Sequence, residues 1–110
     1  MFIKQNRLKK KKDFEKVFKK GKTIKQDLFV FKYIENNQDS PRIGIIISKK
    51  VCSRASERNL IKRRIREIIK KEIDQLKNLD IIIIALSKIS KDIPFTELEQ
   101  EINKFYERIY

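Results

Sequence analysis

Hydrophobic residues near the start of the chain recur with a helical period. Phe14, Val17 and Phe18 are spaced i, i+3 and i+4, which predicts one apolar face of a short helix over residues 11–20. Gly21 follows this segment directly, and glycine is common just past the C-terminus of a helix. The first predicted element is therefore an amphipathic helix of about three turns.

Three later segments have the β-branched and aromatic character of strands. The predicted strands span residues 27–35, 42–48 and 80–86, and an extra strand is possible around residues 22–25. Residues 36–41 (NNQDSP) have the composition of a turn between the first two strands. Because a helical segment separates residues 42–48 from 80–86, the sequence predicts a strand–helix–strand crossover, which is compatible with a parallel pair.

The longest predicted helix, over residues 56–76, has two unlike faces. Its apolar side chains fall within an arc of about 140° at 100° per residue. They are Ile61, Ile65, Ile68, Ile69, Ile73 and Leu76. The opposite side carries Asn59, Arg63, Arg66 and Lys70, and Arg58 and Lys62 lie along one edge of the apolar stripe. We expect the apolar face to dock on the sheet and the basic face to meet solvent.

A third amphipathic helix completes the chain. Pro94 precedes Thr96 and Glu99, which have the Thr-x-x-Glu spacing of a capping box. The apolar positions of this helix are Leu98, Ile102, Phe105 and Ile109. The order of elements predicts a single α+β domain over residues 1–110, in which a small sheet packs with helices against one face.

The composition excludes several kinds of catalytic site. The chain of 110 residues has no His and one Cys, so it can form neither a Cys/His zinc site nor a Ser–His–Asp triad. A single Cys also excludes an internal disulfide, which suits the reducing cytoplasm. The longest apolar run, Ile81–Leu86, has six residues, whereas a bilayer span needs about 18. We expect a cytoplasmic protein without a membrane segment.

The positive charge is concentrated in two segments. Lys and Arg number 28 against 15 Asp and Glu, a net charge of +13. Residues 1–25 carry +9 and residues 49–71 carry +8, whereas residues 72–110 carry −3. Clustered cations repel one another, and a bound polyanion relieves that repulsion and releases counterions. The pattern favours nucleic acid as the partner; an anionic membrane surface and simple solvated basic faces are the alternatives.

Some aromatic and basic residues are candidate contacts to unpaired RNA. Phe14 and Phe18 lie in a lysine-rich helix, and unpaired bases stack on aromatic rings. Aromatic residues at helical spacing are more often core residues, so both interpretations stay open, as they do for Tyr33. Lys49 and Lys50 follow a predicted strand, a weak signal because such pairs are usually solvated.

Several segments, collinear over residues 7–86, resemble the protein component of bacterial ribonuclease P. They are RLKK at 7–10, DF and VF at 13–14 and 17–18, RIGIIISKKV at 42–51, RNLIKRRIRE at 58–67 and DIIIIA at 80–85. The basic helix is the specific part of this resemblance. The family usually has Arg-Asn-Arg at its start, and Leu60 replaces the second Arg here. We expect that contact to be lost or shifted to another arginine: Arg54, Arg63 or Arg64.

The resemblance implies a subunit of a ribonucleoprotein endonuclease that removes the 5′ leader from precursor tRNA. A catalytic RNA subunit would carry out the hydrolysis with Mg²⁺ held mainly by RNA, and this chain would provide no catalytic or metal-binding residue. It would act as a monomer within the ribonucleoprotein. The resemblance also implies a left-handed β-α-β crossover, although most such crossovers are right-handed. The alternative is a non-catalytic RNA-binding module such as a ribosomal protein or an RNA chaperone.

The resemblance further implies two sets of RNA-binding residues. The residues implied to bind the catalytic RNA are Arg58, Asn59, Lys62, Arg63, Arg66, Lys49 and Lys50. Those implied to line a cleft for the single-stranded leader are Phe14, Phe18 and either Lys32 or Tyr33.

Overall fold

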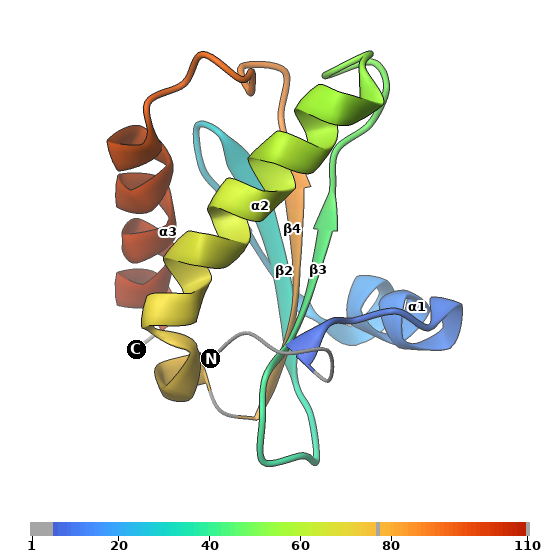
Figure 1. Ribbon diagram of the computed structural model, residues 1–110. Coiled ribbons are helices and arrows are strands. Elements are labelled where there is room, and N and C mark those ends of the chain that lie inside the picture. The colour runs from blue at the N-terminus through green and yellow to red at the C-terminus, as the bar shows by residue number, and fades with distance from the viewer. Residues whose placement is uncertain (1–5, 77, 110) are drawn as a thin grey trace.

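The computed structural model describes residues 6–76 and 78–109, which form three α-helices and a four-stranded sheet (Figure 1). In chain order the elements are α1 (Lys11–Lys20), β1 (Lys22–Lys25), β2 (Phe29–Glu35), β3 (Arg42–Ile46), α2 (Ala55–Lys71), the 3₁₀-helix η2 (Ile73–Leu76), β4 (Leu79–Ala85) and α3 (Phe95–Ile109). The predicted α+β class and the order of elements, including the extra short strand, are confirmed.

The sheet is mixed, with the strand order β1-β2-β4-β3. Strand β2 pairs antiparallel with both β1 and β4, whereas β3 pairs parallel with β4. In Figure 1, β3 and β4 both rise, α2 lies in front of them and β4 lies to the left of β3. The crossover through α2 is therefore left-handed, as the family resemblance implied and against the usual preference.

Helices α2 and α3 cover one face of the sheet and form the main core with it. All six apolar residues predicted for the longest helix are at most 4% exposed. From α3, the ring of Phe105 stacks on that of Phe31 in β2, with centroids 4.2 Å apart. The apolar stripe of the basic helix is thus committed to the core, which leaves the opposite side of α2 to solvent.

Helix α1 covers the other face of the sheet, where Leu8, Val17 and Ile82 form a second apolar cluster. Successive residues of β4 point to opposite faces, so Ile81 and Ile83 join the main core while Ile82 meets α1. The expectation that helices pack against one face only was wrong. A continuous run of isoleucines makes β4 apolar on both sides, and both sides must be covered.

Several predicted element boundaries also need correction. Strand β2 begins at Phe29 instead of residue 27, and β3 ends at Ile46 instead of residue 48. Helix α2 ends at Lys71, and the last turn expected for it is the separate 3₁₀-helix η2. Helix α3 begins at Phe95, and its first hydrogen bonds run from the N–H groups of Glu97 and Leu98 to the carbonyl oxygen of Pro94. Thr96 therefore lies inside the first turn, where it cannot be the N-cap of the expected capping box.

Candidate nucleic-acid interface

The outer face of α2 presents polar side chains that have no partner within the described part of the chain. Asn59 and Arg63 are exposed, and Lys62 and Arg66 are half-buried. Among residues 6–76 and 78–109, none of these four side chains has a hydrogen bond or an ion pair. Because unpaired cations and amides can bind phosphates and bases, this face is available to an anionic partner.

A groove of about 430 Å³ lies on this face of α2. Its charged lining residues are Arg7, Arg63, Arg66, Lys70 and Glu67. Partial burial, and secondarily the positive charge of Arg7, lower the pKa of Arg66. The guanidinium nevertheless stays charged at physiological pH. Arg7 belongs to the quoted N-terminal motif, but sequence reasoning did not include it among the RNA-binding residues.

Two other arginines of α2 donate hydrogen bonds to backbone carbonyl oxygens of the protein. Nη1 of Arg58 donates hydrogen bonds to the carbonyl oxygens of Cys52 and Ser53, both at 2.9 Å, and so holds the loop before α2. Nη1 of Arg64 donates to the carbonyl oxygen of Lys91 at 2.8 Å and ties α2 to the loop before α3. Arg64 is therefore poorly placed to replace the arginine that the family has at the position of Leu60.

The loop between β3 and α2 carries Lys49 and Lys50, which are both exposed. The N–H groups of Val51 and Cys52 donate to the carbonyl oxygen of Ser48 at 3.2 and 3.0 Å, which closes this loop into a turn. With Arg58 holding its far end, the loop presents its two lysines next to the N-terminus of α2.

Cys52 is an ordinary buried thiol in this loop. It is 6% exposed, and its Sγ donates a hydrogen bond to Oε2 of Glu57 at 3.3 Å. Burial first, and then the hydrogen bond and charge of Glu57, raise the pKa of Cys52. The group stays protonated at neutral pH, so it is a weak nucleophile.

The sheet face beside α1 gathers aromatic side chains and a lysine. Phe14 is half-buried and its ring packs onto the backbone of Gly44 in β3. Phe18 is 41% exposed, and Nζ of Lys32 lies 5.7 Å from the centroid of its ring. Nζ of Lys32 also donates to Oγ1 of Thr23 at 3.0 Å, which holds the ammonium group near the ring.

Tyr33 lies on the opposite face of the sheet from Lys32. Adjacent residues of a strand alternate between faces, and Tyr33 packs edge-on against Phe105 with centroids 5.7 Å apart. The structure therefore brings Lys32 together with Phe14 and Phe18, and it separates Tyr33 from them.

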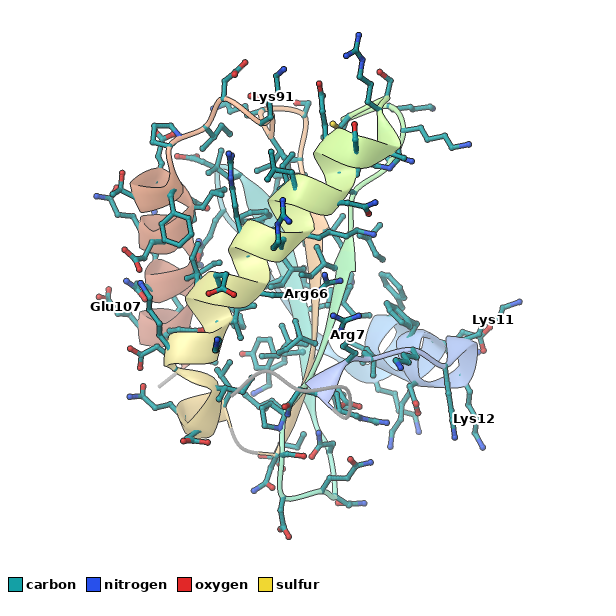
Figure 2. The ribbon with its side chains drawn as sticks, in the orientation of Figure 1. Arg7, Lys11, Lys12, Arg66, Lys91 and Glu107 are labelled. Atoms are coloured by element: carbon teal, nitrogen blue, oxygen red, sulfur yellow. The ribbon has the colours of Figure 1, made fainter. Side chains whose placement is uncertain are left out.

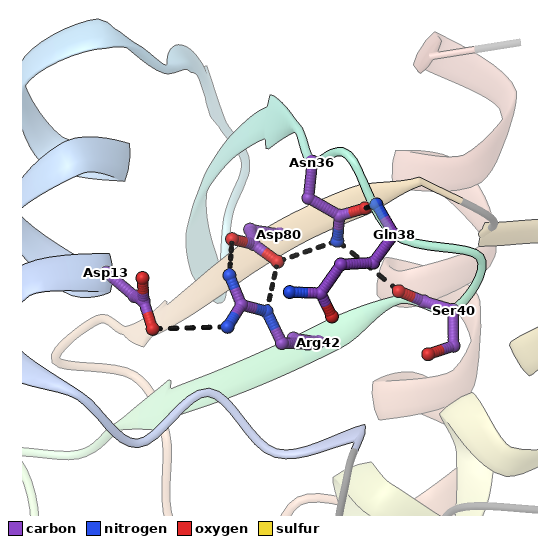
Figure 3. A network of polar contacts seen from close by, with 6 residues as sticks. All are labelled: Asp13, Asn36, Gln38, Ser40, Arg42 and Asp80. Atoms are coloured by element: carbon purple, nitrogen blue, oxygen red, sulfur yellow. Dashed lines mark hydrogen bonds and ion pairs between the residues drawn. The ribbon is translucent and has the colours of Figure 1, made fainter.

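A buried polar network connects α1 to the sheet (Figure 3). Asp80 is 3% exposed, and Arg42 donates to both of its carboxylate oxygens, at 2.9 and 2.6 Å. Nδ2 of Asn36 donates to the same carboxylate at 2.8 Å, and Nη1 of Arg42 also reaches Asp13 of α1 at 3.1 Å. The hydrogen bond to Asp80 is the main cause that raises the pKa of Arg42.

This network was missed from the sequence. Its two main residues lie at matching ends of the strands that flank the crossover, because Arg42 is paired with Asp80 in the β3–β4 register. Pairing the two predicted strands in parallel from their first residues would have placed Arg42 beside Asp80 and so predicted the ion pair. The network fixes Asp13, and with it the neighbouring Phe14, at a defined place on the sheet.

A family model described as Ribonuclease P matches residues 2–110. The chain belongs to the ribonuclease P protein family. The ribonuclease P protein component of Bacillus velezensis is 38% identical over 106 residues, which cover 96% of this chain and 90% of the relative. That of Streptococcus pyogenes is 36% identical over 97 residues, or 88% of this chain and 80% of the relative.

Solved structures of the family agree with this assignment. The ribonuclease P protein of Staphylococcus aureus has a TM-score of 0.85 at 33% identity and covers 94% of each chain. That of Thermotoga maritima has a TM-score of 0.85 at 30% identity and covers 94% of this chain and 97% of its own. The resemblance read from the sequence is confirmed. The chain is a protein subunit of an endoribonuclease that processes the 5′ end of tRNA, and a ribosomal protein or RNA chaperone is not favoured.

Proposed function

We propose that this subunit uses two separate surfaces within the ribonucleoprotein. The outer face of α2 docks on the catalytic RNA, and the sheet face beside α1 binds the single-stranded 5′ leader of precursor tRNA. The observation that carries the proposal is the set of side chains on α2 that have no partner among the described residues. They are Asn59, Lys62, Arg63 and Arg66.

The docking surface suits a folded RNA. From Arg58 to Arg66 the helix rises about 12 Å, so the side chains between them span several phosphates. Arginine binds a phosphate through two hydrogen bonds, and Asn59 can read a base edge or a 2′-hydroxyl. Nη1 of Arg58 makes both of its carbonyl contacts, which leaves Nε and Nη2 for a phosphate. Lys49 and Lys50 extend the same positive surface beyond the N-terminus of α2.

The leader surface suits unpaired nucleotides. The exposed ring of Phe18 offers a stacking face for a base, and the ammonium group of Lys32 lies close enough to contact the adjoining phosphate. Phe14 supports this surface from below, where it packs on Gly44. We assign the leader contact on β2 to Lys32, because Tyr33 packs against Phe105 on the other face of the sheet.

We infer that the magnesium ions of the reaction are held by RNA. Within the described residues, no three His, Cys, Asp or Glu side chains are grouped to hold a metal ion. The carboxylates of Asp13 and Asp80 are both engaged by Arg42. These residues do not fit a magnesium site, so we derive no catalytic step from this chain.

We place the ribonucleoprotein in the cytoplasm, where precursor tRNA is made in bacteria. The helices of the described residues are each too short or too polar to cross a bilayer.

We also propose that residues 1–110 act as one RNA-binding domain, since α1 and α2, which carry the two proposed surfaces, pack on the two faces of a single sheet.

The proposal is tested by processing of precursor tRNA at low Mg²⁺ with the catalytic RNA present. We expect the protein to accelerate cleavage strongly and to cleave nothing by itself. Absence of stimulation would overturn the assignment of this subunit, and cleavage by the protein alone would overturn the division of labour between protein and RNA.

A pair of phenylalanines tests the leader surface. Phe18 and Phe95 are similarly exposed, at 41% and 37%, and each has a lysine ammonium near its ring. We expect Phe18→Ala to lower the preference for substrates with a leader by about 1–3 kcal/mol, the value of one stacked base. Phe95→Ala, at the start of α3, should leave that preference unchanged. Global unfolding of Phe18→Ala, detected by circular dichroism, would show that the ring is a core residue instead.

A further inference from the structure

Arg7 is held at the edge of the sheet by its neighbours in sequence. It forms an isolated parallel bridge with Ile43 of β3, and the N–H of Leu8 donates to the carbonyl oxygen of Ile43 at 2.9 Å. Leu8 is buried against α1, whereas Nδ2 of the buried Asn6 donates to the carbonyl oxygen of Pro41 at 2.8 Å. Because adjacent residues of an extended segment point to opposite faces, Arg7 is directed to the α2 side.

Arg7 and Arg66 meet in the groove on the outer face of α2. Both residues line the groove, and Figure 2 shows the two labelled side chains close together, to the right of the lower half of α2. Among the described residues, neither guanidinium has a hydrogen bond or an ion pair. Of the described residues that line the groove, Glu67 has the single carboxylate, and four residues carry a positive charge.

This arrangement has an electrostatic cost in the free protein. Two like charges in a partly desolvated groove repel each other, and the lowered pKa of Arg66 reflects both burial and the charge of Arg7. A structural role would pair each arginine with a carbonyl or a carboxylate, as it does for Arg42, Arg58 and Arg64. An anion placed between the two groups would remove the repulsion and fill their unused donors.

We propose that Arg7 and Arg66 form one phosphate-binding site, in which a single phosphodiester of the catalytic RNA accepts hydrogen bonds from both guanidinium groups. The inference rests on the proposed function and extends the docking surface from α2 to the segment before α1. Two planar guanidinium groups can occupy both non-bridging oxygens of one phosphate. Since Arg7 is bonded to β3 and Arg66 belongs to α2, the bound phosphate would link β3 and α2, the first two elements of the crossover.

A double-mutant cycle tests this site. The dissociation constant of the cognate catalytic RNA transcript is measured over a range of KCl concentrations for the wild type, Arg7→Gln, Arg66→Gln and the double variant. Arg108→Gln is the matched control, because it removes the same charge from the exposed side of α3. We expect each single substitution in the site to weaken binding about ten-fold, the loss of one charge-assisted contact. The double variant should lose much less than the product of the two single losses.

Two outcomes would overturn the shared site. One is an Arg7→Gln variant whose dissociation constant equals that of Arg108→Gln. The other is a double variant whose loss of affinity equals the product of the two single losses. A wild-type protein that shows no preference for the catalytic RNA over an unrelated folded transcript would instead overturn the proposed function.

A measurement without RNA tests the site independently of the ribonucleoprotein. Inorganic phosphate should raise the melting temperature of the wild type more than that of Arg7→Gln, because the variant lacks one half of the site. Equal rises in the two proteins would count against the site even if the whole protein binds catalytic RNA.

Discussion

Arginines that are close in the sequence of α2 do different work in the structure. Arg58 and Arg64 donate to backbone carbonyl oxygens, whereas Arg63 and Arg66 have no partner in the described residues. The helical position of each residue decides this difference. Arg64 is directed to the loop before α3, and Arg63, one residue earlier, is turned by 100° toward solvent.

This difference leads to opposite effects of two neighbouring substitutions. Arg63→Ala should leave the free energy of unfolding within about 0.5 kcal/mol of the wild type. It should reduce the salt slope of RNA binding by about 0.7–0.9. Arg64→Ala should cost about 1 kcal/mol of stability, for the lost hydrogen bond to Lys91, and leave the slope unchanged. Urea unfolding and salt-dependent binding measure both quantities. An equal loss of slope in the two variants would place the α3 side of α2 on the interface as well.

The thiol of Cys52 gives a pH-dependent prediction. Its pKa is raised by burial and by Glu57, so the reactive thiolate forms only at higher pH than in an ordinary cysteine. Glu57→Gln removes the negative charge and leaves the burial. The rate of alkylation by iodoacetamide should therefore rise at a lower pH in the variant than in the wild type. The unfolded protein in urea supplies the reference profile, and identical profiles for the two folded proteins would show that Glu57 has no influence on the thiol.

At the scale of elements, a close packing contact and an ion pair add to the apolar cluster around Val17 in holding α1 on the sheet. The ring of Phe14 packs on Gly44, and Asp13 binds Arg42 at 3.1 Å. A Cβ at position 44 would lie 2.6 Å from Cζ of Phe14, closer than atoms can approach. Gly44 therefore allows α1 to approach β3.

Gly44→Ala should displace the ring of Phe14 and lower the free energy of unfolding by about 1–3 kcal/mol. The combination with Phe14→Leu should lose less than the sum of the two single losses, because the smaller side chain leaves room for the methyl group. Urea denaturation of the wild type and the three variants measures this coupling. Strictly additive losses would mean that the ring moves aside without cost.

The sequence was sufficient for elements whose patterns are local. The stripe from Ile61 to Leu76 predicted a docked helix because periodicity directly reports a buried face. The continuous run Ile81–Ile84 makes β4 apolar on both faces, so a helix has to cover each face, whereas helices were expected on one face only. The hand of the crossover is set by no local pattern and came from the family resemblance alone.

The candidate site was predictable in its residue types but not in its partners. Arg58 and Arg64 bind carbonyl oxygens of loops whose path depends on the tertiary fold. Lys32 and Tyr33 were separated only when the strand was assigned to a face, since a shift of one residue exchanges them. Arg7 joined the surface because the segment before α1 is bonded to β3.

At the scale of the whole molecule, charge is divided between the helices. The segments that contain α1 and α2 hold the excess of Lys and Arg, whereas residues 72–110, with α3, carry a net charge of −3. Figure 2 shows this contrast in Lys11 and Lys12 on α1 and Glu107 on α3. An anionic partner is therefore steered to the α1 and α2 surfaces and away from α3.

Self-repulsion of this charge should make the free protein more stable as salt is added. Raising the ionic strength from 0.01 to 0.1 M shortens the screening length from about 30 Å to about 10 Å. We expect the melting temperature to rise by at least about 4 °C, the shift produced by 1 kcal/mol in a domain of this size. Calorimetry at fixed pH measures it, with KCl and NaCl compared to exclude a specific ion. A falling melting temperature would mean that attractive pairs such as Arg42–Asp80 outweigh the repulsion.

Because the sheet has helices on both faces, the two proposed RNA surfaces lie on opposite sides of a fully packed protein core. The shorter dimensions of the molecule are 26 Å. The Arg42–Asp80 network fixes α1 to the sheet and so keeps this separation constant. In the proposed complex the subunit would serve as a rigid spacer that fixes how far one nucleic-acid chain runs from the other. Leaders too short to cross that distance would gain nothing from Phe18, whatever their bases.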